Sequence, residues 1–437
     1  MLKLLRQFDF TIFILAAILV IVPLFPKFPF IRIPGSYVAI RFEDAILLVL
    51  GIMVAVKAIP KLKEFLTDPI IRALIVFFGI GFASVLSGAF LTQTIDVKIG
   101  MLHLLRRIEY VVPFFAALTL LTKEKLGNSL DYFIKLLMAV TIIAFIYGVG
   151  QRYFRFPIII TQNEEYSKGV ALFWTSGSHV NSTFAGHYDL AAFMVLLLPV
   201  FLTLLFLVRD KFSKIFLLLT SVGGLWLLIN SVSRISQVSY LFAVAVAFVL
   251  VKKYKELAVV LAISIALIAL SGDLVARFQR IFEVYAEEPI ATIVPTPVPV
   301  PVFEDRSTSI RLNVEWPRAI RALTKNPILG TGYSSITLAT DNDYLRLLGE
   351  TGVLGFASFF LIFLRIGQVF LAALPLPNRF SGVALGFMTG IIGGLGGTFL
   401  SATFIDLFEA SKFATILWFL LGCAVVLAKN NTNVQKN

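Results

Sequence analysis

Residues 187–208 read HYDLAAFMVLLLPVFLTLLFLV and contain no charged side chain after Asp189. An apolar run of about 20 residues is long enough to cross the hydrocarbon core of a bilayer as a helix. Similar runs recur along the 437-residue chain, which is 58% hydrophobic and only 15% charged, whereas soluble domains carry about 25% charged residues. The sequence therefore predicts an all-α polytopic membrane protein and excludes a string of ordinary soluble domains.

Hydropathy places about twelve membrane-spanning helices along the chain. We expect them near residues 10–25, 40–58, 70–90, 100–121, 130–149, 187–208, 213–230, 235–251, 255–271, 350–373, 382–402 and 411–428. Lys and Arg are more frequent in the short loops on the side of the two termini than in the short loops on the other side. Because short cytoplasmic loops carry an excess of Lys and Arg, both termini are predicted to be cytoplasmic.

The composition also limits the chemistry that the protein can perform. Cys423 is the single cysteine, and the three histidines, His103, His179 and His187, are not paired at metal-ligand spacing. These counts exclude disulfides and a thiolate metal site, and no sequence pattern indicates a nucleotide or another cofactor. The net charge of +12 lies mostly at helix ends and in loops, where it orients the chain and faces anionic lipids. We therefore expect membrane lipids as neighbours, and neither nucleic acid nor a cofactor as a partner.

Three polar segments interrupt the helices, and all three fall on the predicted external side, at residues 151–186, 230–236 and 271–349. The pattern divides the chain into an N-terminal bundle of about nine helices, one large extracytoplasmic loop, and C-terminal helices with a short cytoplasmic tail. These parts are expected at residues 1–271, 272–349 and 350–437.

The large loop contains two distinct stretches. Residues 289–303 are rich in Pro and Val and are expected to be extended. Residues 307–326 regain a helical period and predict an amphipathic helix on the outer surface of the bundle. Its apolar face carries Leu312, Trp316, Ile320 and Leu323, and its basic residues lie largely opposite, at Arg311, Arg318, Arg321 and Lys325. The basic stripe has two interpretations, a face in contact with solvent or lipid headgroups, or part of a binding site.

Arg234 stands between two apolar runs in the segment INSVSRISQVSY, residues 229–240. An arginine near membrane depth costs about 2.5–3.5 kcal/mol on insertion scales and usually faces a cavity or a partner. Arg234 is therefore either an interfacial arginine whose side chain reaches the headgroups, or a donor for phosphate oxygens, which the guanidinium fork binds well.

Residues 325–355, KNPILGTGYSSITLATDNDYLRLLGETGVLG, hold a second group of candidates. Gly330 and Gly332 suit a tight turn with close backbone approach, although no Walker lysine accompanies them. Asp341, Asn342 and Asp343 gather three polar side chains at a predicted helix start, where they can act as caps or in general-base and electrostatic roles. The Asp-x-Asp pattern can also hold a divalent cation, but nearby arginines already supply positive charge, so we favour a metal-free site.

The order of these motifs resembles the O-antigen ligase and O-antigen polymerase family of bacterial membrane glycosyltransferases. Family members typically have a Ser-Arg pair that opens a helix, matched by Ser233-Arg234, and an arginine in the large external loop, matched by Arg311. A Pro-x-x-Gly-x-Gly stretch follows, matched by residues 327–332, and then His-Asn-x-x-Leu and a Gly-x-x-Gly step, matched by 341–345 and 352–355. Asp341 stands in place of the family's histidine. A softer match is the segment 182–187, which ends at His187.

The resemblance implies a GT-C-like helical bundle that transfers a glycan from a polyprenyl-diphosphate carrier, such as undecaprenyl diphosphate, to a hydroxyl of a glycan, lipid or protein acceptor. It implies a metal-independent inverting enzyme in the bacterial cytoplasmic membrane, with an external active site that serves lipopolysaccharide or other cell-envelope polysaccharide biosynthesis. Catalytic roles would fall to Asp341, Arg234 and Arg311. Substrate-binding roles would fall to Asn342, Asp343, Arg318, Gly330, Gly332 and His187.

The main alternative is a membrane transporter or flippase of lipid-linked glycans. Transporters of many folds have internal repeats with broken helices at matching positions, and the long loop has no counterpart in the N-terminal half. Glycines at intervals of four in the helix at 382–402 are more typical of close helix packing than of a gate. They stand at Gly382, Gly386, Gly390 and Gly394.

Overall fold

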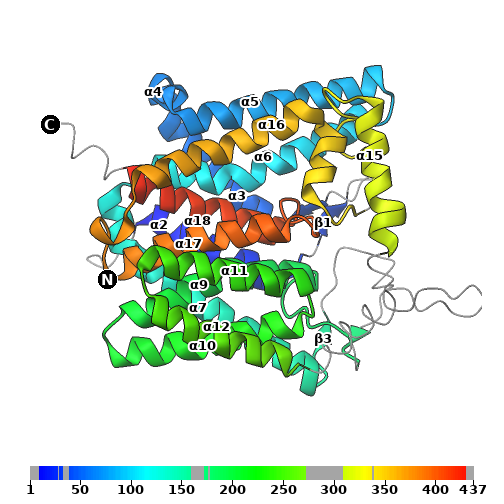
Figure 1. Ribbon diagram of the computed structural model, residues 1–437. Coiled ribbons are helices and arrows are strands. Elements are labelled where there is room, and N and C mark those ends of the chain that lie inside the picture. Colours follow the sequence, from blue (N-terminus) through cyan, green and yellow to red (C-terminus); the bar gives the residue numbers. More distant parts are fainter. Residues whose placement is uncertain are drawn as a thin grey trace, which may run out of the picture.

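The computed structural model describes residues 9–27, 29–32, 39–158, 172–175, 178–271, 309–336 and 339–429. Over these residues the chain is almost entirely helical (Figure 1). Its helices are α2 (Phe10–Leu24), α3 (Phe42–Ala58), α4 (Leu62–Thr67), α5 (Pro69–Leu86), α6 (Val97–Leu120), α7 (Lys123–Tyr153), α9 (His187–Leu207), α10 (Lys211–Asn230), α11 (Arg234–Val251), α12 (Tyr254–Ala269), α15 (Trp316–Lys325), α16 (Asp343–Ala372), α17 (Gly382–Ser401) and α18 (Ser411–Lys429). The Pro/Val-rich stretch at 289–303 lies outside the described residues.

Short elements complete the chain. Two antiparallel strand pairs are β1 (Pro29–Arg32) with β2 (Ala39–Arg41), and β3 (Pro157–Ile158) with β4 (Leu172–Phe173). Single turns of 3₁₀ or π helix are η1 (Ile59–Lys61), η2 (Ser87–Leu91), η3 (Arg311–Glu315) and η4 (Leu376–Asn378).

The prediction of an all-α polytopic membrane protein is confirmed, and each of the twelve expected spans corresponds to a helix. Among the described residues, nine helices are long and apolar enough to cross a membrane. The other three expected spans are not among these nine helices. Two of them, α2 and α12, have only 15 and 16 residues, and the third, α6, carries Arg106, Arg107 and Glu109 near its middle.

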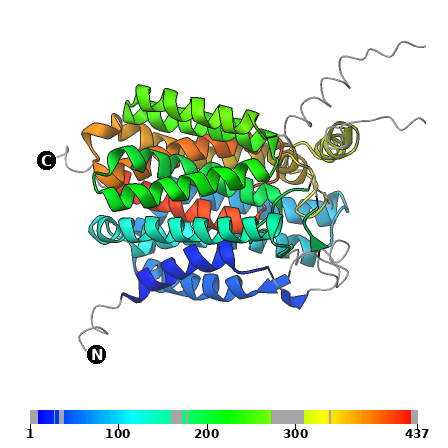
Figure 2. The same ribbon diagram turned by 90° about the horizontal axis from the view of Figure 1, so that it is seen from below.

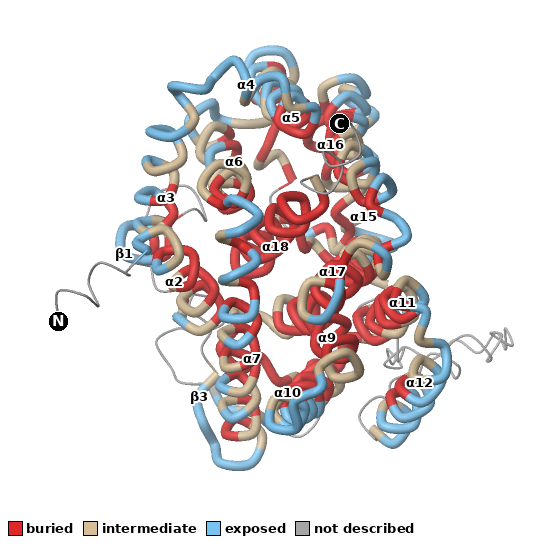
Figure 3. Tube along the Cα trace, turned by 90° about the vertical axis from the view of Figure 1, so that its left-hand side faces the viewer, coloured by how far each residue is buried: buried red, intermediate tan, exposed pale blue. Residues whose placement is uncertain are grey.

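The helices run side by side around a buried centre (Figures 1 and 2). Buried residues concentrate in α9, α17 and α18, whereas α3, α4 and α12 are largely exposed (Figure 3). The glycines of α17 permit close packing on α9, because a Cβ atom at Gly390 would lie 2.4 Å from the Cα of Val200 and one at Gly394 would lie 2.7 Å from the carbonyl oxygen of Leu196. Gly382 has no such neighbour.

The polar segments gather at one end of the bundle. There the amide of Val180 donates to the carbonyl of Asn230 over 2.9 Å, and Arg311 contacts Tyr188 at the start of α9. We call this the α15 end, because α15 lies across it, roughly perpendicular to the bundle helices (Figures 1 and 2). The first and last described helices start and finish at the opposite end, where Lys125 pairs with Asp9 and Lys429 pairs with Asp68.

The predicted faces of the amphipathic helix need correction. Leu312 and Ile320 are each 48% exposed, whereas Arg311 is only 8% exposed. The helix packs on α16 through Ala319, and the Arg311 guanidinium turns inward to pair with Asp341. The basic residues therefore do not form one solvated stripe, and part of the apolar face is left on the outside.

The orientation in the membrane can be tested by cysteine labelling in a Cys423→Ala background. We expect an impermeant maleimide to label Arg321→Cys on α15 in intact cells, and to label Lys63→Cys on α4 only after lysis, because the short loops near α4 are the more basic ones. Both positions are exposed. The reverse pattern would contradict the orientation.

Candidate active site

Helix α16 is two helices joined at a sharp break. Gly352 has φ +67° and ψ −170°, and the limbs at 343–351 and 353–372 bend so far that the rings of Tyr344 and Phe360 lie 5.7 Å apart between centroids. The second limb corresponds closely to the expected span at 350–373. The first limb lies at the α15 end.

The backbone groups released by this break are paired with the loop at 326–332. Two amides of the second limb donate to loop carbonyls, from Val353 to Pro327 at 2.9 Å and from Leu354 to Ile328 at 3.2 Å. Two loop amides donate to carbonyls of the first limb, from Thr331 to Gly349 at 3.0 Å and from Gly332 to Glu350 at 2.8 Å. Unpaired backbone groups are costly where water is excluded, so the loop and the break depend on each other.

Glycine is required on both sides of this contact. Gly330 has φ +68°, and a Cβ atom there would lie 2.4 Å from the carbonyl carbon of Glu350. A Cβ atom at Gly352 would lie 2.3 Å from the carbonyl oxygen of Ile328. The two glycine motifs of the sequence therefore meet in one structural joint. Gly330 contacts this backbone, whereas Gly332 packs against Ile95 and Gly88, and the expected substrate-binding role of both glycines stays a prediction.

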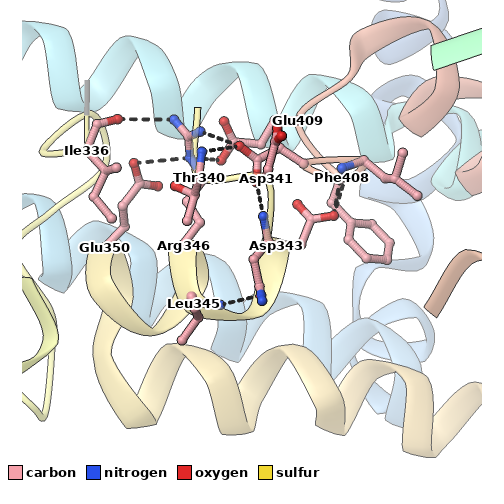
Figure 4. A network of polar contacts seen from close by, with 12 residues as sticks. Ile336, Thr340, Asp341, Asp343, Leu345, Arg346, Glu350, Phe408 and Glu409 are labelled. Carbon is pink, nitrogen blue, oxygen red and sulfur yellow. Dashed lines mark hydrogen bonds and ion pairs between the residues drawn. The ribbon is translucent and has the colours of Figure 1, made fainter. Parts of the chain in front are cut away.

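A buried charge network surrounds Arg346 of the first limb (Figure 4). Arg346 of the first limb contacts Glu409 at 2.7 Å and Asp406 at 2.9 Å, and it lies 3.6 Å from Glu350. Arg107 of α6 contacts Glu350 at 3.0 Å and also pairs with Glu409. Burial alone would raise the pKa of the Glu409 carboxyl, but the two guanidinium groups outweigh it and lower that pKa. The network connects α6 and α16 with residues 402–410.

Asp406 connects this network to Asp341. Its carboxylate accepts hydrogen bonds from the amides on both sides of Asp341, from Thr340 at 2.8 Å and from Asn342 at 3.0 Å. Asp341 itself has φ +48°, a left-handed conformation that is uncommon for non-glycine residues. Such conformations persist only where the surroundings hold them, and they concentrate at functional sites.

The Asp341 side chain pairs with Arg311. Oδ2 of Asp341 lies 2.7 Å from Nη2 and 3.1 Å from Nε of Arg311, and Nη2 also donates to the hydroxyl of Tyr188 over 3.0 Å. Tyr188 follows His187, whose ring stacks on that of His179 with 3.9 Å between centroids. Burial raises the pKa of the Asp341 carboxyl, and Arg311 only partly opposes this.

Several polar atoms around this pair are buried and have no hydrogen-bond partner within the described part of the chain. They are Oε2 of Glu315, Nε1 of Trp316, Nη1 of Arg318 and Oγ1 of Thr340. Buried polar groups are normally satisfied, so a cluster of unsatisfied donors and acceptors indicates a place for a polar ligand. Burial and the negative charge of Asp341 raise the pKa of Glu315 to about 7.

The side chains of two further candidates, Asn342 and Asp343, accept hydrogen bonds from backbone amides. The Asn342 side chain caps α16 by accepting from the amides of Tyr344 and Leu345. The Asp343 carboxylate accepts from the amides of Leu407 and Phe408 at 2.7 and 3.2 Å. The Asp-x-Asp side chains thus have separate partners, and the described residues contain no group of three or more His, Cys, Asp or Glu arranged for a metal ion.

Arg234 is the first residue of α11 and is partly buried. It follows the turn at 231–233, and Ser233 and Ser236 are hydrogen-bonded to each other at 2.7 Å. Because Asn230 at the end of α10 pairs with Val180 at the α15 end, Arg234 lies at the same end of the bundle as Arg311 and Asp341.

Sequence reasoning missed several residues of the site. Glu315 and Tyr188 had no distinguishing pattern, whereas the network residues had one: charged side chains within apolar helices are rare and usually functional. That signal applies to Arg107, Arg346 and Glu350. The position of Asp406 beside Asp341 depends on tertiary structure alone.

Comparison with known proteins finds a family match for one part of the chain. Residues 219–360 match the family model described as O-antigen ligase, and this stretch contains Arg234, Arg311, Asp341 and the Gly352 break. The resemblance inferred from the motifs is thereby confirmed, and the match of this stretch to the O-antigen ligase family supports a glycosyl-transfer role in polysaccharide biosynthesis. No curated protein sequence matches the chain.

The contribution of Asp406 to the structure of the site can be measured as a change in melting temperature. Asp406→Ala removes one carboxylate partner of Arg346 and leaves two backbone amides without their acceptor, and breaking a buried ion pair costs about 3–5 kcal/mol. We expect a clearly lower melting temperature in detergent. Asp131→Ala is the control, because its ion pair with Lys135 is exposed and such pairs contribute about 0–1 kcal/mol. Equal melting temperatures for the two variants would contradict the structural role of Asp406.

Proposed function

We propose that the protein transfers a glycan from a polyprenyl-diphosphate carrier to a hydroxyl acceptor on the external face of the cytoplasmic membrane. The observation that carries the proposal is the buried Arg311–Asp341 pair, which lies beside unsatisfied polar atoms at the α15 end of a membrane-spanning bundle. A cation and a carboxylate at one membrane surface provide the two functions that such a transfer needs.

The first function is the binding of the diphosphate. Arg311 offers a planar fork of donors suited to phosphate oxygens, and Nη1 of Arg318 lacks a partner among the described residues. As the glycosidic bond to the carrier breaks, its electron pair passes to the diphosphate oxygen. Donors directed at that developing charge are usually the largest catalytic contribution. We also assign a role in diphosphate binding to Arg234, which begins α11 at the same end of the bundle.

The second function is the removal of a proton from the acceptor. The acceptor oxygen attacks the anomeric carbon from the face opposite the diphosphate, and its proton passes to a carboxylate. We assign this role to Asp341. Its burial makes it a stronger base than an exposed aspartate, while Arg311 stabilises its ionised form. The displacement inverts the anomeric carbon and needs neither a covalent intermediate nor a metal ion.

Glu315 has the complementary role of a neutral hydrogen-bond donor. It lies one π-helical turn after Arg311, and a negative charge on it would repel the diphosphate. With a pKa of about 7 it can be protonated at neutral pH. Two carboxyl groups in different environments can thus hold different protonation states, with Asp341 ionised and Glu315 neutral.

The arginine fork can be tested by a charge-conserving substitution. Arg311→Lys keeps the charge but loses the bidentate geometry, and loss of one donor to a developing anion costs about 10²–10³ in kcat. We therefore expect at least about a hundredfold lower transfer to a defined acceptor. Arg321→Lys on the exposed side of α15 is the matched control and should transfer normally. Normal transfer by Arg311→Lys would contradict the proposal.

The two carboxyl groups predict a bell-shaped pH profile. Transfer should fall as pH drops, because Asp341 becomes protonated, and it should fall again as pH rises through about 7, because Glu315 loses its proton. Glu315→Gln mimics the protonated form, so it should stay active and lack the decline on the alkaline side. Asp341→Asn should be inactive at every pH. An inactive Glu315→Gln would overturn the role of Glu315, and an active Asp341→Asn would overturn the role of Asp341.

A further inference from the structure

A pocket lies at the end of the bundle opposite α15, between the start of α5 and the last turns of α16 and α18 (Figures 1 and 3). Its volume is about 200 Å³, and its lining combines charged, polar and apolar side chains. Asp68 and Ile70 come from α5, Arg365 and Val369 from α16, and Lys429 from α18. The pocket therefore joins three helices that are far apart in the sequence.

Arg365 is the charged group of this pocket that no carboxylate neutralises within the described part of the chain. It is half-buried, and its Nη1 donates to Oε1 of Gln368 over 3.0 Å. A single bond to a neutral amide holds the guanidinium group in place and leaves its positive charge. The planar fork of an arginine is well suited to the oxygens of a phosphate.

The other charged groups of the pocket are already engaged with each other. Lys429 pairs with Asp68, and Asp68 also caps α5 by accepting from the amide of Ile70 over 2.8 Å. The lining thus has two basic side chains and one acidic side chain, which gives it a net positive charge. Residues 57–72, which lead into α5 and form its first turn, add to this charge because they contain four basic and two acidic residues.

The three helices of the pocket support the candidate active site at their other ends. The hydroxyl of Ser84, on α5, donates to the carbonyl of Glu350 over 2.6 Å. Helix α16 contains the break at Gly352, and α18 begins directly after the segment 402–410 that holds Asp406. A ligand that binds α5, α16 and α18 together would therefore stabilise the scaffold of the site.

We propose that this pocket binds the phosphate of an anionic phospholipid, such as phosphatidylglycerol, from the leaflet at the end opposite α15. The inference is independent of the proposed transfer function. Basic pockets between membrane helices on the cytoplasmic side bind anionic headgroups, and the charge of the short loops predicts that side for this end. A phospholipid fits better than a free phosphate because part of the lining is apolar, and because Leu364 and Leu371 on the same stretch of α16 are 57% and 67% exposed and offer contact to acyl chains.

The test titrates the full-length protein in detergent with phosphatidylglycerol and follows the melting temperature, because a ligand that binds only the folded state stabilises it. Phosphatidylcholine with the same acyl chains and inorganic phosphate are the comparison ligands. We expect phosphatidylglycerol alone to raise the melting temperature in a saturable way. Arg365→Gln should raise its half-saturating concentration about tenfold, equivalent to about 1.4 kcal/mol. Arg209→Gln is the matched control, because Arg209 is exposed at the same end and does not line the pocket.

A second variant makes the test independent of the folding of Arg365→Gln. Ala372 is exposed and lines the pocket, so Ala372→Trp fills the space and keeps every charge. It should weaken the response to phosphatidylglycerol as Arg365→Gln does, and an unchanged response would overturn the proposal.

Other results would also contradict the inference. An equal response to phosphatidylcholine would show that the headgroup charge is not recognised. An equal response to inorganic phosphate would identify a free-anion site in place of a phospholipid site. An unchanged half-saturating concentration in Arg365→Gln, or the same increase in Arg209→Gln, would show only a general attraction between basic loops and anionic lipid.

Discussion

The break at Gly352 is the constraint on which the site depends. A helix interrupted beside a bilayer leaves amides and carbonyls without partners, and these must be paired within the protein. The loop at 326–332 supplies four backbone hydrogen bonds to the groups on both sides of the break. Because the loop also leads from α15 to Asp341, the same joint that makes the broken helix possible brings Arg311 and Asp341 together.

The charge network gives the joint a fixed shape. Buried ion pairs contribute little net stability, since desolvation offsets their attraction, but removal of one partner is costly. Here the network's carboxylates and guanidinium groups link α6, the first limb of α16 and residues 402–410. Asp406 extends this rigidity to the backbone around Asp341. The network therefore supports geometry at the site, and the unsatisfied atoms beside it are left for a ligand.

Much of this architecture follows from the sequence. Apolar runs predicted the helices, because a bilayer requires spans of about 20 residues, and polar interruptions predicted which segments gather at one end. The order of short motifs identified the family and named Arg234, Arg311 and Asp341 as candidates. Hydropathy also located the second limb of α16 correctly, since that limb is far more apolar than the first, which carries Asp343, Arg346 and Glu350.

Other features could not be obtained in this way. The faces of α15 were predicted from periodicity alone, but the ion pair with Asp341 turns Arg311 inward and leaves Leu312 outside. Gly330 was expected in a tight turn with close backbone approach, but the sequence did not show that the approaching backbone is the helix break at Gly352. The partnership of Asp406 with the backbone of Asp341 spans more than 60 residues and depends on the tertiary arrangement.

The most direct test of the account is a structure of the protein with a polyprenyl diphosphate bound in a lipid nanodisc. We expect the diphosphate within hydrogen-bonding distance of Arg311 and of Nη1 of Arg318, with the Glu315 carboxyl facing it. A diphosphate bound elsewhere, with the Arg311–Asp341 pair unchanged and the atoms around it still unsatisfied, would contradict the central claim.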